Sequence, residues 1–304
     1  MRVLVTGSSG FVGGALMRDL RRDGLDARPL VRVPSAGAPS WDPGVGEIDA
    51  DGLEGFDAVV HLAGENIAGG RWTASRRRRI QESRVGATGL LAAALAKLDS
   101  PPKCLISASA LGFYGDRGEE LLDETSPRGS GFLAELASDW EAAAAPTAKA
   151  DIRVVNLRIG TVLGEGGGIL PRLTPLFLAG LGGRLGSGRQ FMSWIALDDL
   201  VQAIRFAIET NSLEGPVNAC APAPVTNGEF TRLFARSLGR RAILPVPAFA
   251  IRLAFGQMAD ELLLSGQRVR PARLLEAGFD FRHANLGGLL RHLYSKSEGP
   301  LHGR

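Results

Sequence analysis

The sequence predicts an α/β fold, in which a doubly wound parallel sheet carries a smaller C-terminal lobe. Two observations support this prediction. Short apolar runs typical of buried strands alternate with longer helical patterns along the first half of the chain. The chain also has 304 residues, of which 45% are hydrophobic, so it can bury a large core.

The strand and helix patterns follow one another from the N-terminus. Strands are expected at residues 2–6, 27–32, 58–62, 105–109 and 153–159, and helices at 15–20, 75–98, 132–145 and 197–210. The stretch 164–188 is rich in glycine and contains Pro171 and Pro175, so the chain should leave the sheet there. We therefore predict a dinucleotide-binding domain over 1–165 with 197–212, and a smaller substrate lobe over 166–196 and 213–304.

The turn between the first strand and the first helix has the pattern of a phosphate-binding site. It consists of Thr6, Gly7, Ser8, Ser9, Gly10, Phe11, Val12 and Gly13. Gly7 permits the sharp turn, Gly10 lets the backbone approach a pyrophosphate, and Gly13 lets the helix pack closely on the strand. Since the free N–H groups of the helix face the phosphates, this turn predicts a Rossmann-type fold that binds a dinucleotide.

The glycine spacing after Thr6 resembles the short-chain dehydrogenase/reductase superfamily. Residues 57–64 are similar to its fourth strand and imply that Leu62, Ala63 and Gly64 form the turn beneath the adenine and ribose. Residues 103–109, followed by Tyr114-Gly115, are similar to the fifth strand of its extended, epimerase-like branch.

Within that branch the chain resembles atypical "epimerase family" proteins, which carry an added C-terminal segment. The matching stretches are residues 70–73 (Gly-Arg-Trp-Thr), 82–85 (Glu-Ser-Arg-Val), 140–143 (Trp-Glu-Ala-Ala), 264–271 and 275–281. The resemblance covers almost the whole chain. It implies a fold and a nicotinamide cofactor, but no defined substrate.

The end of the predicted second strand indicates which nucleotide is bound. An NAD-selective site usually places an acid there for the ribose hydroxyls. This chain has Arg32 and no acid, and a guanidinium can pair with a 2′-phosphate, which favours NADP(H). The alternative is that Arg32 stacks on adenine or is solvated.

The chain departs from the superfamily at the catalytic pair. Short-chain dehydrogenases place Tyr-x-x-x-Lys on one helix face, where the ammonium lowers the phenol pKa. Here alignment places Phe132 and Leu136 at those positions, and neither transfers a proton. Ser109 and Tyr114 are the remaining candidate catalytic hydroxyls, although packing or substrate contact is the alternative role for Tyr114.

Three further residues are candidates for the cleft. Arg158 is predicted to contact the cofactor, with a structural ion pair as the alternative. For Arg84 the alternative is an exposed charge on a helix, and for Trp194 it is core packing.

Two functions remain open at this point. The first is an NADP(H)-binding oxidoreductase or epimerase-like enzyme, in which a nonstandard group supplies the proton. The second is a catalytically inactive protein that binds NADPH and reports its level to a partner. The missing pair favours the second, whereas Ser109 and the complete cofactor turn favour the first, which we prefer.

Charge and composition limit the partners. The net charge is +3, and the run Arg76 to Arg79 would point around a helix rather than form one stripe, so we expect no nucleic acid but a small-molecule substrate, with an anionic one as an option. No apolar run reaches the ~20 residues of a membrane span, which predicts a cytoplasmic protein. Cys104 and Cys220 are isolated, and the histidines show no ligand spacing, so we expect no metal. The oligomeric state is left open.

Overall fold

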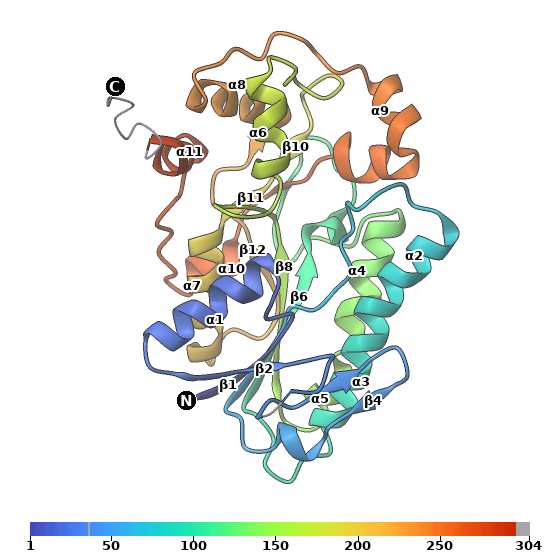
Figure 1. The fold of residues 1–304 in the computed structure, drawn as a ribbon, viewed down its shortest axis with the longest axis vertical. Coiled ribbons are helices and arrows are strands. Elements are labelled where there is room, and N and C mark those ends of the chain that lie inside the picture. The colour runs from blue at the N-terminus through green and yellow to red at the C-terminus, as the bar shows by residue number, and fades with distance from the viewer. Residues whose placement is uncertain (36, 296–304) are drawn as a thin grey trace.

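The computed structural model describes residues 1–35 and 37–295. Its centre is a six-stranded parallel sheet with the strand order β12-β8-β6-β5-β1-β2 (Figure 1). The strands are β1 (Arg2–Thr6), β2 (Asp26–Leu30), β5 (Ala58–His61), β6 (Cys104–Ala110), β8 (Arg153–Ile159) and β12 (Gly215–Ala219). From β1 the chain runs outward to β2 and then returns to β5 on the other side, so the carboxyl ends of β1 and β5 form the topological switch point.

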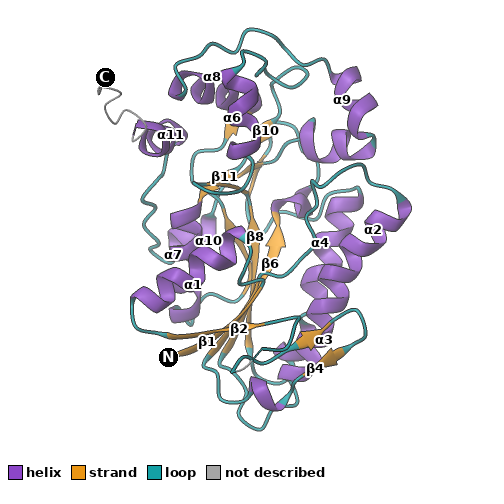
Figure 2. Ribbon diagram, viewed as in Figure 1, coloured by secondary structure: helices purple, strands orange, loops and turns teal. Residues whose placement is uncertain are grey.

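Helices cover both faces of this sheet, which confirms the predicted Rossmann-type α/β fold (Figure 2). One face is covered by α1 (Phe11–Arg22) and α7 (Leu197–Glu209). The other is covered by α3 (Ala87–Leu95), α4 (Phe132–Ala142) and α5 (Ala145–Ala148). Val3 and Val5 pack into the first layer and Leu4 into the second, all fully buried, because side chains alternate along a strand.

A smaller lobe lies beyond the carboxyl ends of the strands (Figure 1). Its strands pair in short two-stranded sheets: β9 (Thr161–Leu163) with β11 (Trp194–Ala196), β10 (Phe191–Met192) with β13 (Val225–Thr226), and β7 (Leu121–Leu122) with β14 (Arg268–Val269). Its helices are α6 (Leu170–Leu178), α8 (Asn227–Ser237), α9 (Ala248–Phe255), the π-helix η4 (Ala259–Leu263) and α11 (Leu286–Tyr294). Trp194 is fully buried in the core of this lobe, the alternative named for it from the sequence.

Part of the segment after residue 213, which was predicted to form the smaller lobe, packs on the nucleotide domain. β12 pairs with β8 at the edge of the main sheet. After it, α10 (Ala272–Glu276) and the rings of Phe279 and Phe281 pack into the core of the nucleotide domain. Asp199 fixes this return, since its carboxylate accepts hydrogen bonds from the N–H groups of Arg282 and His283. The C-terminal segment therefore belongs to both units.

The long helix predicted over 75–98 is divided into three parts. It runs as α2 (Ala74–Gln81), a π-helical turn η2 (Glu82–Gly86) and then α3. A π-turn inserts one extra residue and changes the direction of the side chains that follow, and such turns are frequent at functional sites. The remaining short elements are β3 (Trp41–Asp42), β4 (Glu47–Ile48) and the 3-10 turns η1 (Asp51–Leu53) and η3 (Leu111–Tyr114).

Candidate functional site

The glycine turn lies at the switch point between β1 and β5, packed against the turn that follows β5. Gly7 adopts a φ of +65°, and a Cβ there would lie 2.8 Å from the carbonyl carbon of Leu62. A Cβ at Gly13 would lie 2.2 Å from the oxygen of Gly7. Both positions therefore require glycine, for the turn and for the close approach of helix to strand.

The N-terminus of α1 is open toward the carboxyl edge. Gly10 is the N-cap residue and provides no side-chain cap, so the N–H groups of the first turn are left for a ligand. Ser8 is partly exposed and Ser9 is exposed beside them. The ring of Phe11, in contrast, packs under the loop at residues 164–168, where a Cβ at Gly167 would lie 2.3 Å from it. Val12 packs against the core.

Thr6 joins the two turns through a buried hydrogen-bond chain. Its Oγ1 accepts the N–H groups of Leu62 (3.1 Å) and Ala63 (3.2 Å), so its own proton goes to Nδ1 of His61 at 2.7 Å. His61 Nε2 therefore carries the other proton and donates it to Thr88 Oγ1 at 3.0 Å, which also accepts from the indole of Trp140. These hydrogen bonds hold the turn at 62–64 against the end of β1.

Stability is expected to fall in weak acid because of this histidine. Burial lowers the pKa of His61 from 6.5 to about 4, so the unfolded state binds the proton first as the pH falls. The stabilisation is complete above pH 6.5 and is lost as the pH falls toward 4, by about 3 kcal/mol at 1.36 kcal/mol per pKa unit. Urea unfolding at pH 7 and pH 4.5 measures this change.

The matched variant is His61→Gln, whose amide does not titrate. Its stability should fall less than that of the wild type over the same window. Equal pH dependence in the two proteins, or an NMR titration in which the His61 ring gains its proton near pH 6.5, would contradict the assignment.

Arg32 follows the end of β2, next to β1 at the same edge of the sheet. Its side chain is exposed. No residue in 1–35 or 37–295 forms a hydrogen bond or an ion pair with it. A guanidinium on this side of the glycine turn is available to an anion on the adenosine half of a dinucleotide.

The structure brings Ser109, Tyr114 and Arg158 together, but in a buried network. Arg158 forms a two-point ion pair with Glu141 of α4, with Nε–Oε1 at 2.7 Å and Nη2–Oε2 at 2.8 Å. Ser109 Oγ donates to the same carboxylate at 2.7 Å. Arg158 Nη1 donates to the phenol oxygen of Tyr114 at 3.0 Å, and that phenol donates to Asn218 Oδ1 at 2.7 Å.

The burial of this network bears on the roles predicted for the three residues. The side chain of Tyr114 is fully buried, Ser109 is 3% exposed and Arg158 is 3% exposed. Burial raises the pKa of the Tyr114 phenol to about 12, which disfavours proton transfer near neutral pH. Because all three groups are buried and engaged by protein partners, the geometry argues against catalysis by Ser109 or Tyr114 and against a cofactor contact by Arg158. The ion pair named as the alternative for Arg158 is the observed arrangement.

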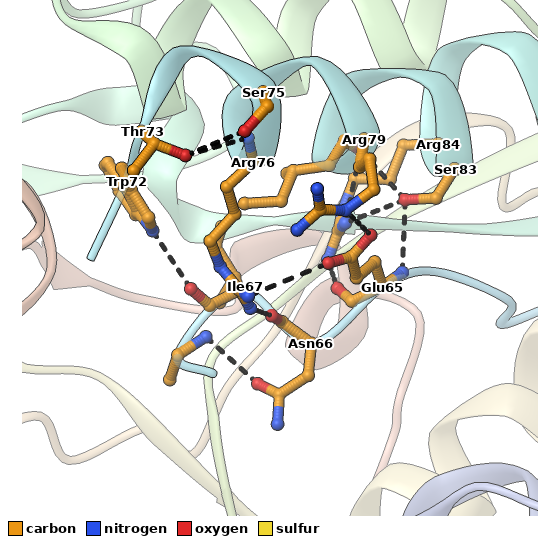
Figure 3. Close-up of polar contacts among 12 residues, drawn as sticks. Glu65, Asn66, Ile67, Trp72, Thr73, Ser75, Arg76, Arg79, Ser83 and Arg84 are labelled. Carbon is orange, nitrogen blue, oxygen red and sulfur yellow. Dashed lines mark hydrogen bonds and ion pairs between the residues drawn. The ribbon is translucent and has the colours of Figure 1, made fainter. Parts of the chain in front are cut away.

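The loop after β5 forms a second polar cluster, which contains the cleft candidate Arg84 together with partners that the sequence did not indicate (Figure 3). Ser83 Oγ accepts the N–H of Glu65 at 3.1 Å, and Arg84 Nη2 donates to the Glu65 carbonyl at 3.0 Å. The Glu65 carboxylate lies 3.4 Å from Arg79 Nε and 3.8 Å from Arg76 Nη1. Consecutive residues of the π-turn, Ser83 and Arg84, therefore hold the backbone of Glu65 through both its N–H and its carbonyl group.

The arginine run at 76–79 is thus divided between structural and exposed roles. Arg76 donates to the Asn66 carbonyl at 2.6 Å beneath the loop. Arg77 donates to Gln257 at 3.2 Å and lies over the ring of Phe132. Arg78 is exposed. Arg78 and Arg79 are exposed, whereas Arg76 and Arg77 are half-buried, so the run points around the helix as the sequence predicted.

The comparisons with known proteins agree with this geometry. The model of the NAD dependent epimerase/dehydratase family matches residues 3–220. The chain belongs to this family. Residues 246–293 match a domain described only as a domain of unknown function (DUF1731), which corresponds to the added C-terminal segment. No helix among the described residues has the length and apolar character that a membrane crossing requires.

Individual relatives of this epimerase family chain cover nearly its whole length. The epimerase family protein Mb2239 of Mycobacterium bovis is 47% identical over 290 residues, which are 95% of this chain and 96% of the relative. The crystal structure of human epimerase family protein SDR39U1 with NADPH has a TM-score of 0.90 and 38% identity, over 97% of this chain and 99% of the human one. A nucleoside-diphosphate sugar epimerase from Corynebacterium glutamicum has a TM-score of 0.82 and 39% identity, over 97% of this chain and 58% of that one.

Proposed function

We propose that this chain is an NADP(H)-binding oxidoreductase or epimerase-like enzyme that acts on a small molecule. The observation that supports the proposal best is the open N-terminus of α1 behind a turn that requires glycine at Gly7 and Gly13, with Arg32 free at the end of β2. These residues fit a dinucleotide whose pyrophosphate lies on α1 and whose 2′-phosphate pairs with Arg32. The human relative that was solved with NADPH supports the same choice of cofactor.

An anionic substrate fits the charges at the edge of the nucleotide domain. Arg71 and Arg77 lie where the loop after β5 and α2 meet the segment around Gly256 and Gln257 of the smaller lobe. Arg79 is half exposed on the same helix, with Glu65 as its partner. The three guanidinium groups outnumber the two nearby carboxylates, Glu65 and Glu261, and this excess of positive charge favours a substrate with a phosphate or carboxylate.

The chemistry of this site has to proceed without a tyrosine–lysine pair. NADPH, when bound, supplies the hydride. The side chains of Phe132 and Leu136 on α4 have no ionisable group that could donate a proton. The hydroxyls of Ser109 and Tyr114 are hydrogen-bonded inside the protein. We therefore propose that water or the substrate itself supplies the proton, while this chain binds and orients the two reactants.

Arg32 is expected to set the nucleotide preference. Wild-type protein should bind NADPH at least ~10-fold more tightly than NADH, because a guanidinium–phosphate pair contributes about 1.5–3 kcal/mol. Arg32→Ala should remove most of that preference by weakening NADPH and leaving NADH unchanged. Calorimetric titration of both nucleotides with both proteins measures this. Equal affinities of the wild type for the two nucleotides would overturn the NADP assignment.

Turnover separates the enzyme from the alternative function. The wild type is expected to oxidise NADPH, followed by its absorbance, with at least one member of a panel of anionic carbonyl compounds. Tight NADPH binding without oxidation by any member would favour the catalytically inactive NADPH-binding protein instead.

A further inference from the structure

Arg84 is a partly buried cation for which the described part of the chain provides no carboxylate within 4.0 Å. Glu65 is near enough for its charge to act on the guanidinium, but its carboxylate is engaged by Arg76 and Arg79. The pKa of Arg84 is lowered to about 10, because burial disfavours its charged form.

The hydrogen bonds of Arg84 go to neutral groups. Nη2 donates to the Glu65 carbonyl at 3.0 Å, and Nη1 donates to the Ile80 carbonyl at 3.3 Å and to Ser83 Oγ at 3.4 Å. Its guanidinium carbon lies 5.1 Å from the ring centroid of Trp140 on α4. These contacts hold the guanidinium in place, but none supplies the negative charge that a buried cation requires.

The position of Arg84 next to the turn at 62–64 indicates which anion could pair with it. A Cβ at Gly64 would lie 3.4 Å from the Arg84 guanidinium, so the charge lies directly beside the turn at 62–64. In the sheet, β2 with Arg32 flanks β1 on one side, and β5 flanks it on the other. If the adenosine half of a dinucleotide extends toward Arg32, its other half extends over β5 toward Arg84. The turn at 62–64 would then lie beneath the nicotinamide half, and not beneath the adenine and ribose as the resemblance implied.

We propose that Arg84 anchors the nicotinamide half of NADP(H), by donating hydrogen bonds to its ribose–phosphate portion next to the turn at 62–65. This inference rests on the proposed cofactor. The positive charge would come from the helical segment after β5, because α4 has no lysine to supply it. Leu136 stands at the position of the superfamily's lysine, and Phe132 at that of its tyrosine. Ser83 and Arg84 are consecutive residues of the π-turn, and both form hydrogen bonds with the backbone of Glu65. The guanidinium of Arg84 and the loop at Glu65 are therefore held together as one unit.

Two nucleotides of different length test this assignment. NADPH contains both halves, whereas 2′,5′-ADP contains only the adenosine half that Arg32 would hold. Arg84→Met is expected to weaken NADPH binding by about 10–100-fold, the range of a charge-assisted hydrogen bond, and to leave 2′,5′-ADP binding within about twofold of the wild type. Arg84→Lys, which keeps the charge, should recover most of the loss.

The matched control is Arg78→Met, which removes an exposed arginine from the same helical run and should bind both nucleotides as the wild type does. A purely structural role for Arg84 would reduce the binding of both nucleotides together. The emission of the nicotinamide in bound NADPH gives an independent signal, and it should shift toward that of free NADPH in Arg84→Met only. If Arg84→Met does not fold, Arg84→Gln, which keeps a donor for the Glu65 carbonyl, takes its place.

Unchanged NADPH affinity in the neutral variant, or equal losses for NADPH and 2′,5′-ADP, would overturn the role of Arg84 and leave the proposed function standing. Failure of the wild type itself to bind NADPH would instead overturn the proposed function.

Discussion

Gly10→Val is expected to weaken NADPH binding by at least ~100-fold, which corresponds to about 2.8 kcal/mol, while the protein stays folded. The backbone at Gly10 has φ −75° and ψ 174°, an extended conformation that any residue adopts. A Cβ there meets the protein only at Gly7 O, at 3.1 Å, so its main effect is to place a branched side chain over the open N–H groups of α1.

Two neighbouring glycines in the first turn of α1 provide matched controls. Gly14→Ala adds a methyl group 3.6 Å from its nearest neighbours and should bind NADPH as the wild type does. Gly13→Ala places a Cβ 2.2 Å from the Gly7 oxygen and should reduce the free energy of unfolding as well as binding. Nucleotide titration and urea unfolding of the three variants distinguish these effects, and normal NADPH binding by Gly10→Val would place the nucleotide elsewhere.

Glu141→Leu should lower the free energy of unfolding by about 3–5 kcal/mol, because it leaves the buried Arg158 without its counter-charge. The Glu141 carboxylate accepts hydrogen bonds at 2.7–2.8 Å from Arg158 and at 2.7 Å from Ser109. The side chains of the two charged residues are 13% and 4% exposed, so solvent screens the pair little. Urea unfolding measures the loss.

The double variant Glu141→Leu with Arg158→Met should recover most of that stability, since it leaves no unpaired charge. It should also bind NADPH within about threefold of the wild type, because Arg158 is engaged by Glu141 and Tyr114. A loss below about 1 kcal/mol in the single variant would mean that the ion pair contributes little. Loss of NADPH binding in the folded double variant would restore the cofactor contact predicted from the sequence.

The cofactor turn could be predicted from the sequence because it depends on local chemistry. The glycines after β1, the apolar run before them and the helix after them all lie within the first 22 residues. β12, for which the sequence patterns predicted no strand, illustrates the limit of such prediction. It is five residues long, and its place in the main sheet is determined by its partner β8, about 60 residues earlier in the chain.

The buried network and the Arg84 cluster could not be predicted, because both depend on tertiary packing. Ser109 and Arg158 lie near the ends of neighbouring strands, as predicted, but only the placement of α4 shows that Glu141 pairs with Arg158 and accepts the hydrogen bond of Ser109. Arg84 occurs within an apparently continuous helical run, where it would be an exposed charge. In the structure Arg84 is partly buried within the π-turn, and the stretch 82–85 that resembles the epimerase family was the available signal for it.

A crystal structure of this protein with NADPH tests the proposed site most directly. The 2′-phosphate is expected beside Arg32, the pyrophosphate on the first turn of α1, and the nicotinamide half along the turn at 62–65 near Arg84. Electron density for the nucleotide away from the glycine turn, or none at a concentration that saturates the protein in solution, would contradict the cofactor site.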